Sequence, residues 1–203
     1  MSRIAIASFG ALIALSIAGP ALAQDSGSNF SGPYFGAQIG WQQDRQSLTT
    51  GTVPPATFRT KGEGLAYGAQ AGWDVNLGRA VVGVEGSLTT RDGANTFPTF
   101  DLEARRTINL TGRLGYLVSP QGLLYARGGY SNARFNIAGV GPSENRDGYT
   151  IGGGYEHSLA RNISARVEYN YSDYGNDLLP GIGSTATLNY HRHAVMTGVN
   201  FRF

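Results

Sequence analysis

Residues 163–175 read ISARVEYNYSDYG, and this stretch decides the fold class. Side chains of an extended chain alternate between two faces, so Ile163 and Tyr169 lie on one side of it. The other side carries Arg166 and Glu168. An apolar, aromatic face opposite a charged face predicts a β-strand with two very different surroundings.

The same alternation recurs in both directions along the chain. A tilted strand that crosses a bilayer needs about 9–11 residues, and eight stretches suit that length. Each has an apolar outward face and an inward face that we expect to be polar or glycine. The apolar faces fall within residues 35–41, 65–75, 80–88, 102–116, 124–130, 149–155, 163–171 and 195–203.

The connections between these stretches alternate in length. Short links rich in Gly, Pro and Asn, typical of tight turns, are predicted at residues 76–79, 119–122 and 159–162. Long polar links are predicted at residues 43–61, 91–101, 137–147 and 173–187. Short turns on one side and long loops on the other are typical of outer-membrane barrels, with both termini periplasmic.

Lipid is the solvent that fits the apolar faces. A soluble barrel would turn those faces inward, or else leave residues such as Trp41, Trp73 and Tyr155 in water as an improbably large patch. The sequence therefore predicts an all-β fold, an eight-stranded antiparallel up-and-down transmembrane β-barrel in the bacterial outer membrane. The formal net charge of +2 gives no indication of nucleic-acid binding.

The N-terminus has the layout of a secretory signal peptide. One basic residue, Arg3, precedes an apolar run that ends in Ala21-Leu22-Ala23, and small residues at these positions favour cleavage after Ala23. We therefore expect a signal peptide over residues 1–23, a short segment over 24–32 and the barrel over 33–203.

Three stretches resemble a known family: SGPYFGAQIGWQ near the mature start, ARVEYNYSDYG in the seventh segment and HAVMTGVNFRF at the end. They are similar to the eight-stranded, porin or opacity-like outer-membrane proteins common in alphaproteobacteria. The resemblance implies the barrel fold, export, and recognition of the terminal Phe203 by the barrel-assembly machinery. It does not imply one activity, because a fold alone does not fix function.

The inward positions collect many charges. An eight-stranded barrel is just wide enough for side chains to fill it, and an unpaired buried charge is costly, so we expect these residues to pair as a plug in the periplasmic half. Counting from the turns places Glu156 opposite Arg166, and Arg113 opposite Arg127. The predicted interior charge network is Glu85, Glu103, Arg105, Arg113, Arg127, Glu156, Arg166, Glu168, Arg192 and Arg202.

A second group is expected near the outer rim. Arg106 interrupts an apolar face there, where it could bind lipopolysaccharide phosphates or could be a solvated charge at the base of a loop. His191 and His193 share one strand face and are candidates for the same lipopolysaccharide contact. With no third ligand visible, interfacial packing is favoured over a metal site, and no cofactor is expected.

Three classes of function remain open at this point. The first is a structural or surface protein with a charge-plugged interior, whose four external loops bind an unknown ligand. The second is a narrow porin-like channel for small polar solutes, since inward glycines such as Gly36 and Gly152 thin the lining of the wall. The third is an enzyme, which we do not expect, because His157 and Ser158 are adjacent and must point to opposite faces.

Overall fold

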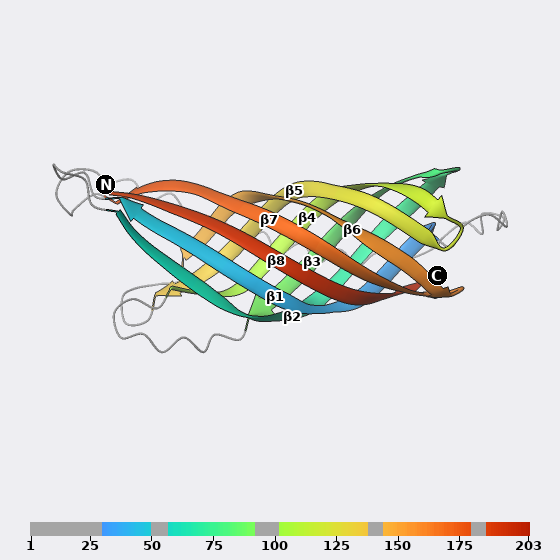
Figure 1. The fold of residues 1–203 in the computed structure, drawn as a ribbon, viewed down its shortest axis with the longest axis horizontal. Coiled ribbons are helices and arrows are strands. Elements are labelled where there is room, and N and C mark those ends of the chain that lie inside the picture. Colours follow the sequence, from blue (N-terminus) through green and yellow to red (C-terminus); the bar gives the residue numbers. More distant parts are fainter. Residues whose placement is uncertain (1–29, 50–56, 92–101, 138–143, 180–185) are drawn as a thin grey trace, which may run out of the picture.

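The computed structural model describes residues 30–49, 57–91, 102–137, 144–179 and 186–203. The predicted signal peptide and most of the segment 24–32 lie outside the described residues. Eight antiparallel strands follow one another around a closed barrel, and β8 pairs with β1 to complete it (Figure 1). The predicted fold class is thereby confirmed. The strands are β1 (Gly32–Thr49), β2 (Thr57–Leu77), β3 (Ala80–Arg91), β4 (Leu102–Ser119), β5 (Gly122–Ile137), β6 (Glu144–Ala160), β7 (Ile163–Leu179) and β8 (Ala186–Arg202).

Three tight turns join strands at the end of the barrel where β1 begins and β8 ends. They lie between β2 and β3, β4 and β5, and β6 and β7, as the sequence predicts. The first turn needs its glycine, because Gly78 has a φ of 89° and its amide donates to Asn76 Oδ1 at 2.7 Å. This end is the periplasmic end of an outer-membrane barrel.

The strands run further toward the other end than the sequence analysis expected. The long polar links predicted from residues 43 and 173 onward belong in large part to paired strands, since β1 pairs with β2 as far as Thr49↔Thr57. Backbone pairing continues where the side chains turn polar, so a loss of apolar alternation does not mark the end of a strand. A register shift between Ala104 and Arg106 also interrupts the predicted regular alternation of β4.

The outer wall of the barrel is apolar. Large side chains such as Trp41, Trp73, Leu114, Tyr155 and Val199 are about half exposed, each on the predicted outward face. Alternate residues of the same strands are buried inside the barrel. Among the described residues there is no helix long and apolar enough to cross a membrane.

The interior is not uniformly polar, which corrects the prediction for the inward faces. Val81 of β3 and Leu123 of β5 point inward and form a buried cluster with Tyr125 and with Phe30, which lies two residues before β1. All four lie toward the periplasmic end. Side chains from three separate parts of the chain thus give this end of the interior an apolar lining.

Candidate functional site

The inward residues of β3 sample the interior from one end to the other. Val81 belongs to the apolar cluster, Glu85 to a first group of charges, Ser87 and Thr89 to a polar region, and Arg91 to a second group of charges. Alternate residues of one strand face the same side, so this order is also their order along the barrel axis. The interior is therefore built in layers.

The inner ionic layer comprises four arginines and four acids, and no more than 4 % of any of these side chains is exposed. Its charges balance. One half centres on Glu85, which contacts Arg166 and lies 2.8 Å from Arg127. The members are Asp74, Glu85, Arg113, Arg127, Glu156, Arg166, Glu168 and Arg202.

The other half of this layer centres on Glu156. Its carboxylate contacts Arg113, lies 2.8 Å from Arg202 Nη2 and accepts a hydrogen bond of 2.5 Å from the Ser164 hydroxyl. Asp74 supports both arginines, at 2.9 Å from Arg202 and 3.7 Å from Arg113. A buried charge is costly unless it is paired and hydrogen-bonded. Glu85, Glu156 and Glu168 meet both conditions, whereas Asp74 has two ion-pair partners but no hydrogen bond to its carboxylate oxygens.

The strand register places Glu156 opposite Arg166 and Arg113 opposite Arg127, in agreement with the count from the turns. Ion pairing, however, does not follow the register. Glu156 of β6 pairs with Arg113 of β4, two strands away, and Arg166 of β7 pairs with Glu85 of β3, on the opposite side of the barrel. Long arginine side chains reach across a narrow interior, so partners are set by position around the barrel and not by adjacency in the sheet.

Two tyrosines complete the inner ionic layer. Tyr34 donates to Glu85 at 2.7 Å, and Tyr125 donates to Glu168 at 2.8 Å. The Arg113 guanidinium lies 4.1 Å from the Tyr125 ring centroid, a cation–π distance. A Cβ at Gly72 would lie 2.5 Å from the Tyr34 ring, so this glycine makes room for the tyrosine. Here an inward glycine serves packing and not an open lumen.

The outer ionic layer consists of Asp44, Arg91 and Arg192. Asp44 lies 2.5 Å from Arg91 Nη1 and 2.8 Å from Arg192 Nε. Arg192 also donates to Thr107 at 2.6 Å and to Tyr190 at 2.8 Å. The prediction that grouped Arg192 with the periplasmic plug is therefore wrong in its placement, because Arg91, which shares Asp44 with Arg192, lies six positions along β3 from Glu85. The side chains of Glu103 and Arg105 lie outside the described residues.

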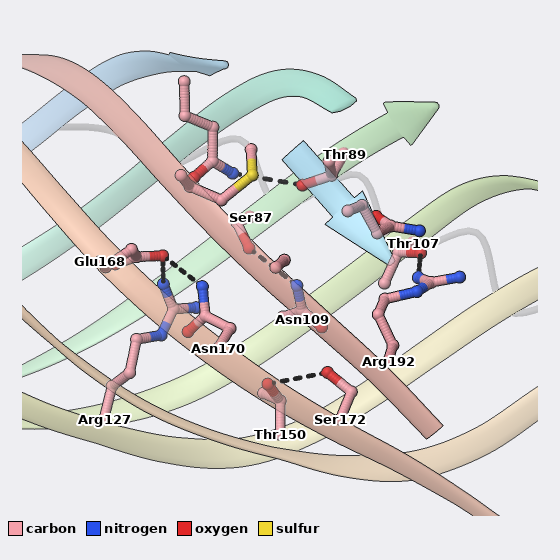
Figure 2. Close-up of a pocket in the computed structure, with 14 residues that line it drawn as sticks. Ser87, Thr89, Thr107, Asn109, Arg127, Thr150, Glu168, Asn170, Ser172 and Arg192 are labelled. Atoms are coloured by element: carbon pink, nitrogen blue, oxygen red, sulfur yellow. Dashed lines mark hydrogen bonds and ion pairs between the residues drawn. The ribbon is translucent and has the colours of Figure 1, made fainter. Parts of the chain in front are cut away.

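A polar cavity of about 40 Å³ lies between the two ionic layers (Figure 2). Arg127 and Glu168 border it on one side and Arg192 on the other. Neutral hydrogen-bonding side chains form most of the wall and bond to one another, including Ser172 to Thr150 at 3.0 Å and Asn109 to Ser87 at 3.1 Å. We refer to this cavity as the polar chamber. Its lining is Gln38, Gln42, Ser87, Thr89, Thr107, Asn109, Arg127, Thr150, Glu168, Asn170, Ser172, Arg192, Ala194 and Met196.

The predicted outer-rim residues face outward and do not form one group. Arg106 of β4 is exposed and lies directly opposite Arg134 of β5, which is also exposed. His193 contacts the Tyr169 hydroxyl at 2.6 Å, and His191 contacts that of Tyr171 at 3.0 Å, both on the β7–β8 wall.

Phe203 lies outside the barrel at its periplasmic end. Its ring centroid is 5.9 Å from that of Phe35 and 5.2 Å from that of Phe201. The terminal aromatic residue thus packs on the seam between β1 and β8, where the barrel closes.

Several residues of the two ionic layers were not predicted. Asp74, Tyr34 and Tyr125 each lie an even number of residues from a predicted inward residue of the same strand. The alternation alone could therefore have predicted that they face inward. Asp44 and Arg91 were assigned to loops, and no feature of their local sequence contradicts that assignment. Only the continued strand pairing brings them inside the barrel.

Comparison with known proteins agrees with the geometry. The family model described as outer membrane protein beta-barrel domain matches residues 9–203. The 25 kDa outer-membrane immunogenic protein of Brucella ovis is 30% identical over 161 residues, which cover 76% of this chain and 75% of that protein. The 22 kDa outer membrane protein of Rhizobium leguminosarum bv. viciae is 26% identical, covering 75% of this chain and 74% of its own length.

Among solved structures, the Ail protein of Yersinia pestis, in complex with the heparin analogue sucrose octasulfate, superposes with a TM-score of 0.51 at 14% identity. The match covers 85% of this chain and 99% of Ail. This likeness concerns the fold alone. The apolar outer wall, the closed eight-stranded barrel and the match over nearly the whole sequence together assign the chain to the outer membrane protein beta-barrel domain family.

Proposed function

We propose that this outer-membrane protein is a closed barrel that acts through its external surface, as a structural or recognition protein. The observation that carries the proposal is the inner ionic layer, whose eight side chains are buried, balanced in charge and cross-linked across the lumen. The apolar cluster around Phe30 lies at the same end. A rigid, closed scaffold leaves the four longer connections at the far end as the place for a ligand to bind.

The test is conductance of the refolded mature protein in a planar bilayer. We expect no steady current from the unmodified protein, because the ions in solution would have to displace buried, paired charges. A steady single-channel current would contradict the proposal and favour the second candidate, a narrow channel for small polar solutes. The polar chamber is the observation that favours that candidate.

We propose that the protein is not an enzyme. Its Brucella relatives are named outer-membrane immunogenic proteins. The one adjacent His and Ser pair considered above does not form a nucleophile and base, since the His157 ring contacts Tyr155 at 3.2 Å and Ser158 donates to the Ala160 carbonyl at 3.0 Å. A hydrolytic site requires the base within reach of the nucleophile.

We also propose that Arg106 contacts lipopolysaccharide, together with Arg134. Two exposed guanidinium groups on paired positions of β4 and β5 suit a phosphate, which arginine binds with a planar fork of donors. The His191 and His193 rings both contact tyrosine hydroxyls, so the proposal assigns the phosphate to the two arginines.

Lipopolysaccharide should raise the urea midpoint of the vesicle-inserted protein, and this gain should shrink in Arg106→Gln/Arg134→Gln. Arg161→Gln is the matched control, since Arg161 is also exposed but lies in a periplasmic turn. Equal gains in the unmodified protein, in Arg106→Gln/Arg134→Gln and in Arg161→Gln would contradict the proposed contact of these arginines with lipopolysaccharide. Recognition of Phe203 by the assembly machinery, removal of residues 1–23 and a ligand at the loops remain parts of the same proposal.

A further inference from the structure

The polar chamber has the properties of a water site. Its volume of about 40 Å³ suffices for about three water molecules, at 10–15 Å³ each. Among the described residues, two residues of its wall each have a buried polar atom without a hydrogen-bond partner in the protein, Arg127 Nε and Asn170 Oδ1. Neutral donors and acceptors such as Thr150 and Ser172 also line the chamber, and water can bond to either kind of group.

Different residues border the chamber toward each side of the membrane. Toward the periplasm lies the inner ionic layer, through Arg127 and Glu168, which are 2.8 Å apart. Toward the exterior lies Arg192, held by Asp44, Thr107 and Tyr190. Across the described residues, no ion pair joins a member of one layer to a member of the other. The two closures are therefore built independently.

We propose that the polar chamber holds a small cluster of water between two ionic layers that close it independently, as two gates in series. Opening one layer connects the chamber to one side of the membrane only, and a path across the membrane requires both to open. The inference rests on the closed barrel proposed above and adds the location of the barriers. About 15 Å separates the two layers, from six residues of β3 at roughly 2.5 Å of height each.

A single thiol inside the chamber can report which side reaches it, because the chain has no cysteine. Ser87→Cys places that thiol on the chamber wall, at a side chain that is 5% exposed. The probe is Ag⁺ in chloride-free buffer, small enough for a narrow path, and given either outside lipid vesicles or trapped within them. Thiols that have not reacted are then counted with a maleimide after unfolding.

The Ser87→Cys change is combined with each of three sets of substitutions in the ionic layers. Arg192→Ala opens the outer ionic layer, Glu85→Ala/Arg166→Ala removes a balanced pair from the inner layer, and the third combines all of these changes. Asn145→Cys and Ser119→Cys, exposed at the loop end and the turn end, fix the orientation of the barrel in the vesicles. Heat-dependent gel mobility identifies folded barrels, and Arg127→Ala/Glu168→Ala is the second inner variant if the first does not fold.

In the reporter protein without gate changes, the thiol should be protected from both sides. Arg192→Ala should raise the reaction rate from the loop side at least about tenfold and leave the turn side unchanged, while an inner variant should do the reverse. The combined variant should react from both sides and conduct. Reaction from both sides in either single-layer variant, or protection in the combined one, would overturn the two-gate inference even if the unmodified protein carries no current. A current in the unmodified protein would instead overturn the closed barrel.

Discussion

Removing one carboxylate from the inner ionic layer should be costly. Glu156 is fully buried and accepts from Arg113, from Arg202 at 2.8 Å, from Ser164 at 2.5 Å and from Asn200 at 3.2 Å. Glu156→Ala leaves four arginines facing three acids. Breaking a buried pair by removing one partner costs about 3–5 kcal/mol. Asp74 still contacts both freed arginines, so we expect the lower end, about 3 kcal/mol of unfolding free energy.

The assay is urea unfolding of the protein inserted in lipid vesicles, followed by tryptophan emission. Trp41 and Trp73 both lie on the lipid-facing wall, so their emission shifts when the barrel leaves the bilayer. The control restores the balance of charge: Glu156→Ala/Arg113→Met should cost less than the sum of its two single variants, by about 1–3 kcal/mol.

The reasoning fails if Glu156→Ala costs under about 1 kcal/mol, the range of a solvated surface pair. It also fails if the two changes are additive, because that result would mean that Glu156 and Arg113 do not interact in the folded barrel.

Three further perturbations test other parts of the structure. Gly72→Ala should lower the unfolding free energy by about 1–3 kcal/mol, measured from urea midpoints, because the new Cβ meets the Tyr34 ring. Gly86→Ala should leave the midpoint unchanged, since the nearest atom to its Cβ is 4.0 Å away. Tyr34→Phe should cost about 1–3 kcal/mol in the same assay by leaving Glu85 with one donor fewer, and an unchanged midpoint would show that the 2.7 Å bond is unimportant. Phe203→Ala should lower the amount of protein in the outer-membrane fraction more than Phe201→Ala does. Both changes remove a ring from the same aromatic contact, but only the first removes the terminal aromatic residue, so equal losses would point to packing alone.

The fold could be predicted because the alternation of apolar and polar residues can be read in each short segment and determines which side chains face the lipid. In β7, Tyr169 and Glu168 are neighbours in sequence and lie on opposite sides of the wall, in lipid and in the lumen. Counting from two of the short turns then predicted the register of two strand pairs, through Glu156↔Arg166 and Arg113↔Arg127.

The division of the interior into two layers could not be predicted in the same way. Whether Arg192 pairs with Glu156 or with Asp44 depends on how far β1 stays paired beyond the apolar band. Polar residues such as Asp44 suit an exposed loop and a barrel lumen equally well. Partners across the lumen also come from strands far apart in sequence, and no local pattern encodes those distances.

The position of Phe30 has a consequence for the order of assembly. Its buried contacts come from Val81 of β3, from Leu123 of β5 and from Arg202, whose guanidinium lies 5.3 Å from its ring. Arg202 ends β8, the strand that follows the other seven along the chain and meets β1 to close the barrel. The full set of contacts around Phe30 therefore forms only once β8 is in place. A residue that precedes β1 thus gains its last native contact when β8 docks, and its complete burial marks a closed barrel.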